Sequence, residues 1–175
     1  MHNKIFYLIF FGIILALARL IPHPPNFSPI IASAIMAPIL IKSRFFAISI
    51  TLIAMFFTDI IVGFHPYMLI IYLTIASISL LSPIKRRLKN FMIFSIFASL
   101  WFFIITNFAV WLAWDYYPKS IEGLISCYVL AIPFFINTLI SSILFTTILF
   151  YLYKPLEILN YKFQNSLSLL FKKFI

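Results

Sequence analysis

The 175-residue chain is 64% hydrophobic and only 10% charged, with a mean hydropathy of +1.11. A water-soluble domain carries about 25% charged residues, so this composition excludes an ordinary soluble globular protein. The net charge of +9 does not indicate a nucleic-acid-binding protein, because the basic residues cluster between long apolar runs, as they do in membrane proteins.

The apolar runs predict an all-α polytopic membrane protein with six transmembrane helices. A spanning helix needs about 20 apolar residues, within a range of about 17–25. In chain order the predicted spans are 5–21, 27–41, 45–63, 67–81, 91–111 and 133–153. Proline lacks a backbone donor and clashes with the preceding turn. Pro133 is therefore expected to separate the last span from a short helix over 119–131, near the outer interface.

The basic residues predict the orientation of these spans. If the connections alternate between the two sides, eleven of the thirteen Lys and Arg residues fall on one side, and only Arg19 and Lys119 on the other. Cytoplasmic connections are enriched in Lys and Arg. We therefore expect a multi-pass protein of the bacterial inner membrane with both termini in the cytoplasm.

The two ends of the chain need separate interpretation. Residues 1–18, which end in Ala16-Leu17-Ala18, also resemble a cleavable signal peptide, although the apolar run is long enough to span. At the other end, apolar residues recur at helical spacing over 154–175, and Lys172 and Lys173 lie near the end of this segment. This pattern predicts a transmembrane domain over 1–153 and an amphipathic cytoplasmic tail over 154–175 that lies on anionic lipid.

Polar and aromatic residues gather in the segments predicted to face outward. Apolar walls with a few convergent polar groups are what a small-molecule pocket requires. Arg19 and Asp59 each lie about one turn inside an outer helix end, where a lone charge is costly, so they are expected to pair with each other or to bind a ligand. The candidate ligand-binding residues are Arg19, His23, Asn26, Asp59, His65, Asn107, Trp111 and Asp115.

Each candidate also has a purely structural interpretation. Trp111 fits the aromatic belt of a membrane boundary. His23 and His65 would hydrogen-bond loop backbone, and two histidines without a third ligand do not specify a metal site. Asn107 and Asn137 would form hydrogen bonds between helices.

Motifs of the common enzyme classes are missing from the sequence. It contains neither Gly-x-Ser-x-Gly nor His-Glu-x-x-His, and its only glycines, Gly12, Gly63 and Gly123, cannot build a phosphate-binding loop. We therefore expect no enzymatic activity and no cofactor. Any uphill transport would draw its energy from a partner or from an ion gradient.

Several segments resemble a family of uncharacterised bacterial integral membrane proteins. The main one is Arg19-Leu20-Ile21-Pro22-His23-Pro24-Pro25-Asn26-Phe27-Ser28-Pro29. Segments 59–65, 106–111, 117–119 and 127–135 share the resemblance, which therefore covers most of the chain between 19 and 135.

The layout is more loosely similar to the S components of energy-coupling-factor vitamin transporters. The resemblance implies a six-helix bundle that binds a vitamin from the outer side. In those proteins a small-x-x-x-small motif in the first helix docks on a transmembrane coupling subunit that is driven by two ATPases. Gly12 and Ala16 match this motif and are the candidate partner-docking residues.

Our first hypothesis is a substrate-capture subunit or small solute transporter that binds a vitamin-like small molecule from the periplasmic side, with segment 119–131 as a lid. A corrinoid held by His65 or Cys127 is conceivable, but the spacing does not favour it. One alternative is a structural or scaffolding membrane protein without a ligand. The other is a membrane-embedded enzyme that would use Asp59, Asp115, His23 and His65.

Overall fold

The computed structural model describes residues 12, 13, 15–83, 85 and 87–173, with side chains as far as Leu152. This part of the chain is all-helical, as predicted. Residues 12–13 and 15–20 belong to a first helical segment. The helices that follow are α2 (Ile30–Ile41), α3 (Arg44–Val62), α4 (Met68–Leu81), α5 (Leu88–Ala113) and α6 (Ile121–Lys173).

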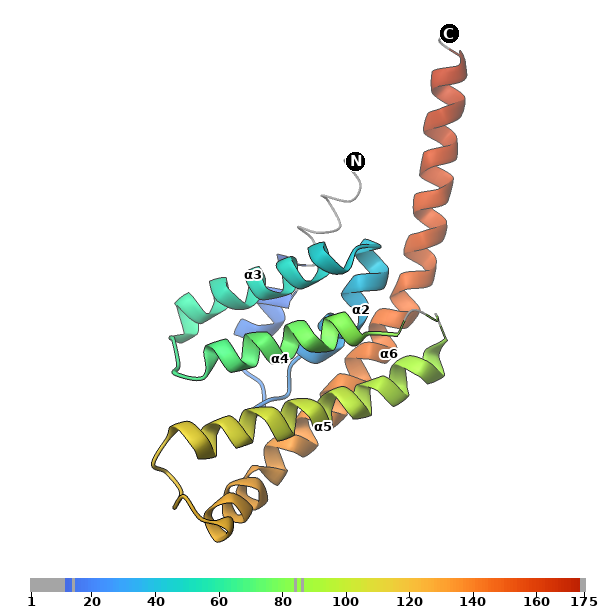
Figure 1. Ribbon diagram of the computed structural model, residues 1–175. Coiled ribbons are helices and arrows are strands. Elements are labelled where there is room, and N and C mark those ends of the chain that lie inside the picture. Colours follow the sequence, from blue (N-terminus) through green and yellow to red (C-terminus); the bar gives the residue numbers. More distant parts are fainter. Residues whose placement is uncertain (1–11, 14, 84, 86, 174–175) are drawn as a thin grey trace.

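Helices α3, α4 and α5 lie side by side and alternate in direction (Figure 1). Their connecting loops therefore gather at two opposite ends of the bundle. We call the end with loops 63–67 and 114–120 the aromatic end, because it carries Tyr67 and Trp114. We call the end with loops 42–43 and 82–87 the basic end, because it carries Lys42, Arg44 and Lys85.

Helix α2 forms the centre of the bundle and packs against α3, α4, α5 and α6. Nine of its twelve residues are buried, among them Ile35 and Met36, which have no exposed surface. At 1.5 Å per residue it is only about 18 Å long. The surrounding helices cover its apolar surface on all sides, so this short helix is shielded from whatever solvent surrounds the bundle.

Three helices among the described residues are long and apolar enough to cross a membrane. They are Arg44–Val62, Leu88–Ala113 and the Ile121–Leu152 part of α6. Many of their large apolar side chains are exposed on the outside of the bundle, including Phe45, Phe57 and Ile61. Such a surface suits lipid better than water. The two shorter apolar helices, α2 and α4, fall below the usual spanning length.

The predicted helix break at Pro133 is wrong. Helix α6 continues from Ile121 to Lys173, so the expected short helix over 119–131, the last span and the tail form one helix. Proline removes one backbone hydrogen bond from a helix, which bends the helix more often than it ends it when neighbours pack on both sides. Figure 1 shows α6 changing direction early, in its orange part. The span expected over 91–111 or a little beyond starts three residues earlier in the structure, where α5 runs from Leu88 to Ala113.

A row of buried hydroxyl groups joins α5 to α6. Ser95 Oγ donates to Thr146 Oγ1 at 3.0 Å, and the hydroxyls of Ser99 and Ser142 lie 2.7 Å apart. All four residues are fully buried. Small residues let two helices approach closely, and hydroxyl pairs between helices hold such contacts in an apolar environment. This seam fixes α6 against α5 and thereby positions the two helices that line the site described next.

Candidate functional site

Arg19 and Asp59 form a buried ion pair between the first helical segment and α3. The Arg19 guanidinium contacts Asp59 Oδ1 and also donates to Met55 O at 2.8 Å and to Thr58 Oγ1 at 2.5 Å. Tyr72 of α4 donates its hydroxyl to Asp59 Oδ2 at 2.5 Å. The Asp59 side chain has no exposed surface, while that of Arg19 keeps 16%.

This network bears on the two roles expected for Arg19 and Asp59. Removing a charge from water costs several kcal/mol, which a partner and extra hydrogen bonds must offset. Asp59 receives both from Arg19 and Tyr72. The guanidinium already serves one carboxylate and two oxygens of α3, which favours the structural interpretation of the pair.

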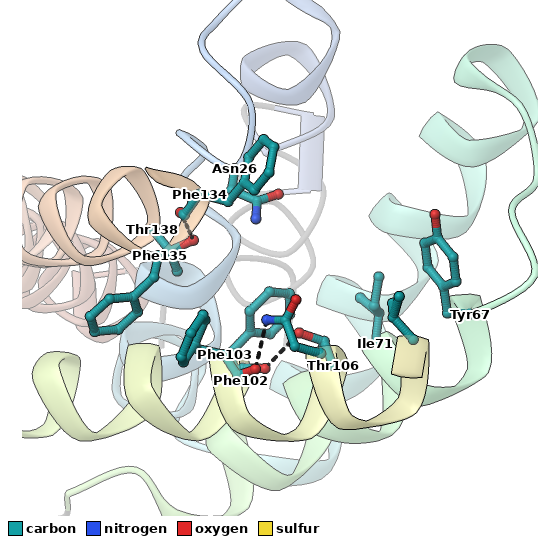
Figure 2. Close-up of a pocket in the computed structure, with 11 residues that line it drawn as sticks. Asn26, Tyr67, Ile71, Phe102, Phe103, Thr106, Phe134, Phe135 and Thr138 are labelled. Atoms are coloured by element: carbon teal, nitrogen blue, oxygen red, sulfur yellow. Dashed lines mark hydrogen bonds between the residues drawn. The ribbon is translucent and has the colours of Figure 1, made fainter. Parts of the chain in front are cut away.

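A cavity of about 160 Å³ lies toward the aromatic end, and no residue of this network lines it. Figure 2 shows its walls, with α5 below, α6 on one side, α4 on the other and Asn26 above them. Aromatic and aliphatic side chains supply most of the lining, and no charged residue takes part. The lining residues are Asn26, Tyr67, Ile71, Phe102, Phe103, Thr106, Asn107, Val110, Phe134, Phe135 and Thr138.

The polar groups of the helices around the cavity can accept hydrogen bonds. Thr106 Oγ1 donates its proton to Phe102 O at 2.7 Å, and Thr138 Oγ1 donates to Phe134 O at 2.9 Å. Asn107 Nδ2 donates to Phe103 O at 2.8 Å. A hydroxyl or amide that has donated to its own helix still offers oxygen lone pairs. These oxygens can accept hydrogen bonds from an uncharged ligand in the cavity.

The loop that carries Asn26 is fastened to α6. Asn137 Nδ2 donates to Pro25 O at 3.0 Å, and the ring of Phe27 meets Phe145 edge-on, with centroids 5.9 Å apart. Asn26 itself has a φ of 62°, a left-handed conformation that asparagine tolerates better than most residues. In Figure 2 its carboxamide points into the space between α5 and α6. Asn137, expected to bridge helices, instead places this loop over the cavity.

An aromatic chain connects the loops of the aromatic end to the cavity. The ring of His65 lies 4.8 Å from that of Tyr67, and Tyr67 in turn meets Trp114 edge-on at 5.0 Å. His65 Nδ1 is buried without a hydrogen-bond partner. Burial lowers the pKa of His65, with Arg19 acting in the same direction and Asp59 opposing it. His65 therefore contributes to the wall behind Tyr67 as a neutral ring.

Three of the predicted ligand-binding residues lie away from the cavity. His23 is exposed, and its Nδ1 is 2.9 Å from Pro24 O. Trp111 donates from Nε1 to Pro118 O at 3.0 Å, while its own carbonyl accepts from Lys119 Nζ. Asp115 is fully exposed, 3.9 Å from Lys119. These contacts shape loop 114–120, and of the eight predicted residues only Asn26 and Asn107 line the cavity.

Gly12, predicted to dock a partner subunit, packs inside this chain. It is buried, and a Cβ atom at this position would lie 3.0 Å from Ile50 Cδ1 of α3. Ala16, one turn later, is partly exposed. The small residues of the first segment thus allow close approach to α3. At Gly12 the face expected to be free for a partner is occupied.

Most of the cavity wall was absent from the sequence-based prediction. Phe102, Phe103, Phe134 and Phe135 lie in long apolar runs, where ring-bearing residues facing a cavity cannot be distinguished from those facing lipid. One signal was available, because Thr106 and Asn107 on one helix are polar neighbours in an otherwise apolar stretch. The sequence-based prediction therefore included two polar residues of the cavity lining, Asn26 and Asn107, but none of its aromatic residues.

Within the residues that the structure describes, no three His, Cys, Asp or Glu side chains gather closely enough to hold a metal ion. Cys127 is buried, with its sulfur 3.5 Å from Asn107 O. His65 contacts Tyr67 within loop 63–67.

The sequence matches a family model described as a family of unknown function over residues 1–165. Neither a curated protein nor a solved structure matches it.

Proposed function

We propose that this chain, which belongs to the family of unknown function DUF6580, captures a small uncharged ring compound at the outer face of a bacterial inner membrane. It would act as a substrate-binding subunit or as a small solute transporter. The observation that carries this proposal is the cavity of about 160 Å³ between Asn26, α4, α5 and α6. Its aromatic walls and few polar groups are typical of small-molecule sites.

The size of the cavity limits the part of a ligand that it can hold. An apolar protein cavity of about 150 Å³ can bind benzene, whereas drug-sized ligands occupy about 300–1,000 Å³. The space therefore fits one six-membered ring, either as a whole ligand or as one ring of a larger vitamin-like solute. Phe103, whose ring lies 4.9 Å from that of Phe135, supplies one wall on which such a ring would stack.

The charge of the cavity limits the ligand's chemistry. No Lys, Arg, Asp or Glu lines it, and Arg19 is committed to Asp59. Moving an ion into such a site without a partner would cost free energy of desolvation. That cost far exceeds the stabilisation from hydrogen bonds to Thr106 or Asn107. A neutral ring that carries an N–H or O–H donor fits better, since the oxygens of these two side chains can accept.

In this proposal all six helical segments cross the membrane, with the basic end in the cytoplasm. Lys42, Arg44 and Lys85 at that end support this orientation. Helices α2 and α4, of 12 and 14 residues, would cross as short helices within the bundle. The cavity would then be reached from the periplasm. Uphill uptake would draw on a partner's ATPases or on an ion gradient, and a coupling partner would have to dock away from Gly12.

Mass spectrometry of small molecules released from protein purified in mild detergent tests this function. The wild-type protein should release a neutral ring compound in near-stoichiometric amount, and Asn107→Ala should lose most of it. Asn90→Ala is the matched control, because Asn90 lies on the same helix at the basic end. Release of equal amounts of the compound from Asn107→Ala and Asn90→Ala would contradict the proposal. A charged compound as the only enriched species would also contradict it. If all variants were functional in cells without a bound compound, a scaffolding role would replace it.

A further inference from the structure

A second pocket, of about 460 Å³, opens on the surface at the basic end, where α3 begins, α4 ends and α5 begins. It is separate from the cavity, with which it shares no lining residue. Two cationic side chains, two leucines and three other residues form its walls. The lining residues are Arg44, Leu80, Leu81, Ser82, Pro83, Lys85 and Asn90.

The charges around this pocket are positive. Arg44 Nη2 donates to Ser82 O at 3.1 Å, which holds the guanidinium at the pocket and leaves its other N–H donors for a ligand. Lys85 is exposed beside it. No acidic residue lines the pocket. In the first turn of α5 there is no acidic residue, and no side chain caps it, so its positive end adds to the same field.

The three acidic residues whose side chains the structure describes lie away from this pocket. Asp59 pairs with Arg19, and Asp115 and Glu122 lie in and after loop 114–120, at the opposite end. An anion in the pocket would therefore meet two cations and no facing carboxylate among the lining residues.

The apolar half of the pocket indicates what kind of anion fits. Leu80 and Leu81 are 51% and 57% exposed and directly precede Ser82. A small soluble anion would use the cations and leave both leucines uncovered. A phospholipid uses both, because its phosphate can meet Arg44 and Lys85 while an acyl chain covers the leucines.

From this combination we propose that the pocket between α3, α4 and α5 at the basic end binds the headgroup of an anionic phospholipid. The phosphate lies between Arg44 and Lys85, and one acyl chain follows the leucines along α4. The inference needs only that the bundle is embedded in a membrane. It does not depend on ligand capture in the cavity, so either proposal can fail alone.

Native mass spectrometry of the full chain tests this site, after incubation with phosphatidylglycerol or with phosphatidylcholine. The wild-type protein should retain phosphatidylglycerol preferentially. Lys85→Gln should weaken that retention about fivefold, which corresponds to about 1 kcal/mol per basic residue near anionic lipid. Arg44→Gln should weaken it at least as much, but Lys85→Gln is the cleaner variant, because Arg44 also holds Ser82.

Lys89→Gln is the matched control. Lys89 is exposed at the same end and does not line the pocket, so it tests whether any lost charge has the same effect. Equal losses in Lys85→Gln and Lys89→Gln would overturn the proposal in favour of diffuse attraction. Equal retention of the two lipids would also overturn it. Inorganic phosphate that displaces phosphatidylglycerol at millimolar concentration would identify a soluble-anion site instead.

Discussion

Arg19 and Asp59 tie the first helical segment to α3 through an ion pair in which the carboxylate has no exposed surface. Loss of either partner leaves the other charge buried and unpaired, which costs about 3–5 kcal/mol. We expect Arg19→Ala and Asp59→Ala each to destabilise the protein strongly in detergent unfolding experiments. The double variant should lose less unfolding free energy than the sum of the two single losses, by about 0.5–3 kcal/mol. Strict additivity would show that the two residues do not interact.

Tyr72→Phe measures the second contact of this network. The substitution removes the hydroxyl that donates to Asp59 Oδ2 and leaves the ion pair in place. A hydrogen bond to a charged group contributes about 1.5–3 kcal/mol. The unfolding free energy should therefore fall by less than in Arg19→Ala. A loss as large as that of Arg19→Ala would mean that the tyrosine, and not the arginine, compensates the buried carboxylate.

Substitution of Gly12 separates internal packing from partner docking. In Gly12→Leu the new side chain would collide with Ile50, so we expect a lower melting temperature for the isolated protein in detergent. Ile50→Ala in the same chain should restore part of the loss, because it makes room. A stable Gly12→Leu protein that has lost only its cellular function would instead support the partner-docking role predicted from the sequence.

The sequence anticipated the charged network because charges are rare in apolar segments. Arg19 and Asp59 stood out there, and their equal distance from an outer helix end suggested a pair. Tyr72 could not be anticipated in the same way. Nothing in its sequence environment shows which side of α4 faces Asp59, and only the packing of α4 against α3 brings them together.

The errors in the sequence-based prediction have a common physical origin. Pro133 was expected to end a helix, but continuous packing of α6 against α5 holds the helix together through it. The cavity walls were missed because helix rotation decides whether Phe102 or Phe135 faces a neighbour or lipid. For Gly12 the partner-docking role stays a prediction, because a small-residue motif does not reveal which helix approaches it, and Ile50 of α3 lies beside it in the structure.

The protonation of His65 predicts a pH dependence of stability. Burial lowers its pKa in the folded state below the ordinary value of 6.5. Below pH 6.5 the unfolded chain binds more protons at this site than the folded chain, so stability falls as the pH drops. Above pH 6.5 His65 is neutral in both states, and its contribution to the stability of the folded protein is fully present.

His65→Phe keeps a ring beside Tyr67 and removes the titration. Melting temperatures measured from pH 7.5 down to pH 5 should fall less steeply for this variant than for the wild-type protein. His23→Phe is the control, because His23 is exposed and lies outside the aromatic chain. If His65→Phe and wild type had parallel pH profiles, burial of a neutral His65 would be contradicted.

Reporter fusions test the proposed orientation of the bundle. Fusions after Arg87 and at Ile175 should report the cytoplasm, and a fusion near Lys119 should report the periplasm. The physical reason is the enrichment of Lys and Arg in cytoplasmic connections. A single fusion that reports the opposite side would contradict the six-span arrangement, in particular the crossing of the short helices α2 and α4.

Titration calorimetry of three matched probes tests whether the cavity takes an uncharged ring with hydrogen-bond donors. Benzamide carries N–H donors, methyl benzoate lacks them, and benzoate carries a charge. Benzamide should show saturable binding. The other two should bind about tenfold more weakly or worse, because an unpaired buried acceptor costs about 1–3 kcal/mol and an unpaired ion costs more.

Val110→Trp, which fills the cavity, should abolish benzamide binding. Val62→Trp is the matched control and should bind like wild type, because Val62 is exposed at the end of α3 and does not line the cavity. Absence of saturable benzamide binding to folded wild-type protein would show that the cavity does not take such a ring. Equal affinity for benzamide and benzoate, or unchanged binding in Val110→Trp, would also contradict selective binding of an uncharged ring in the cavity.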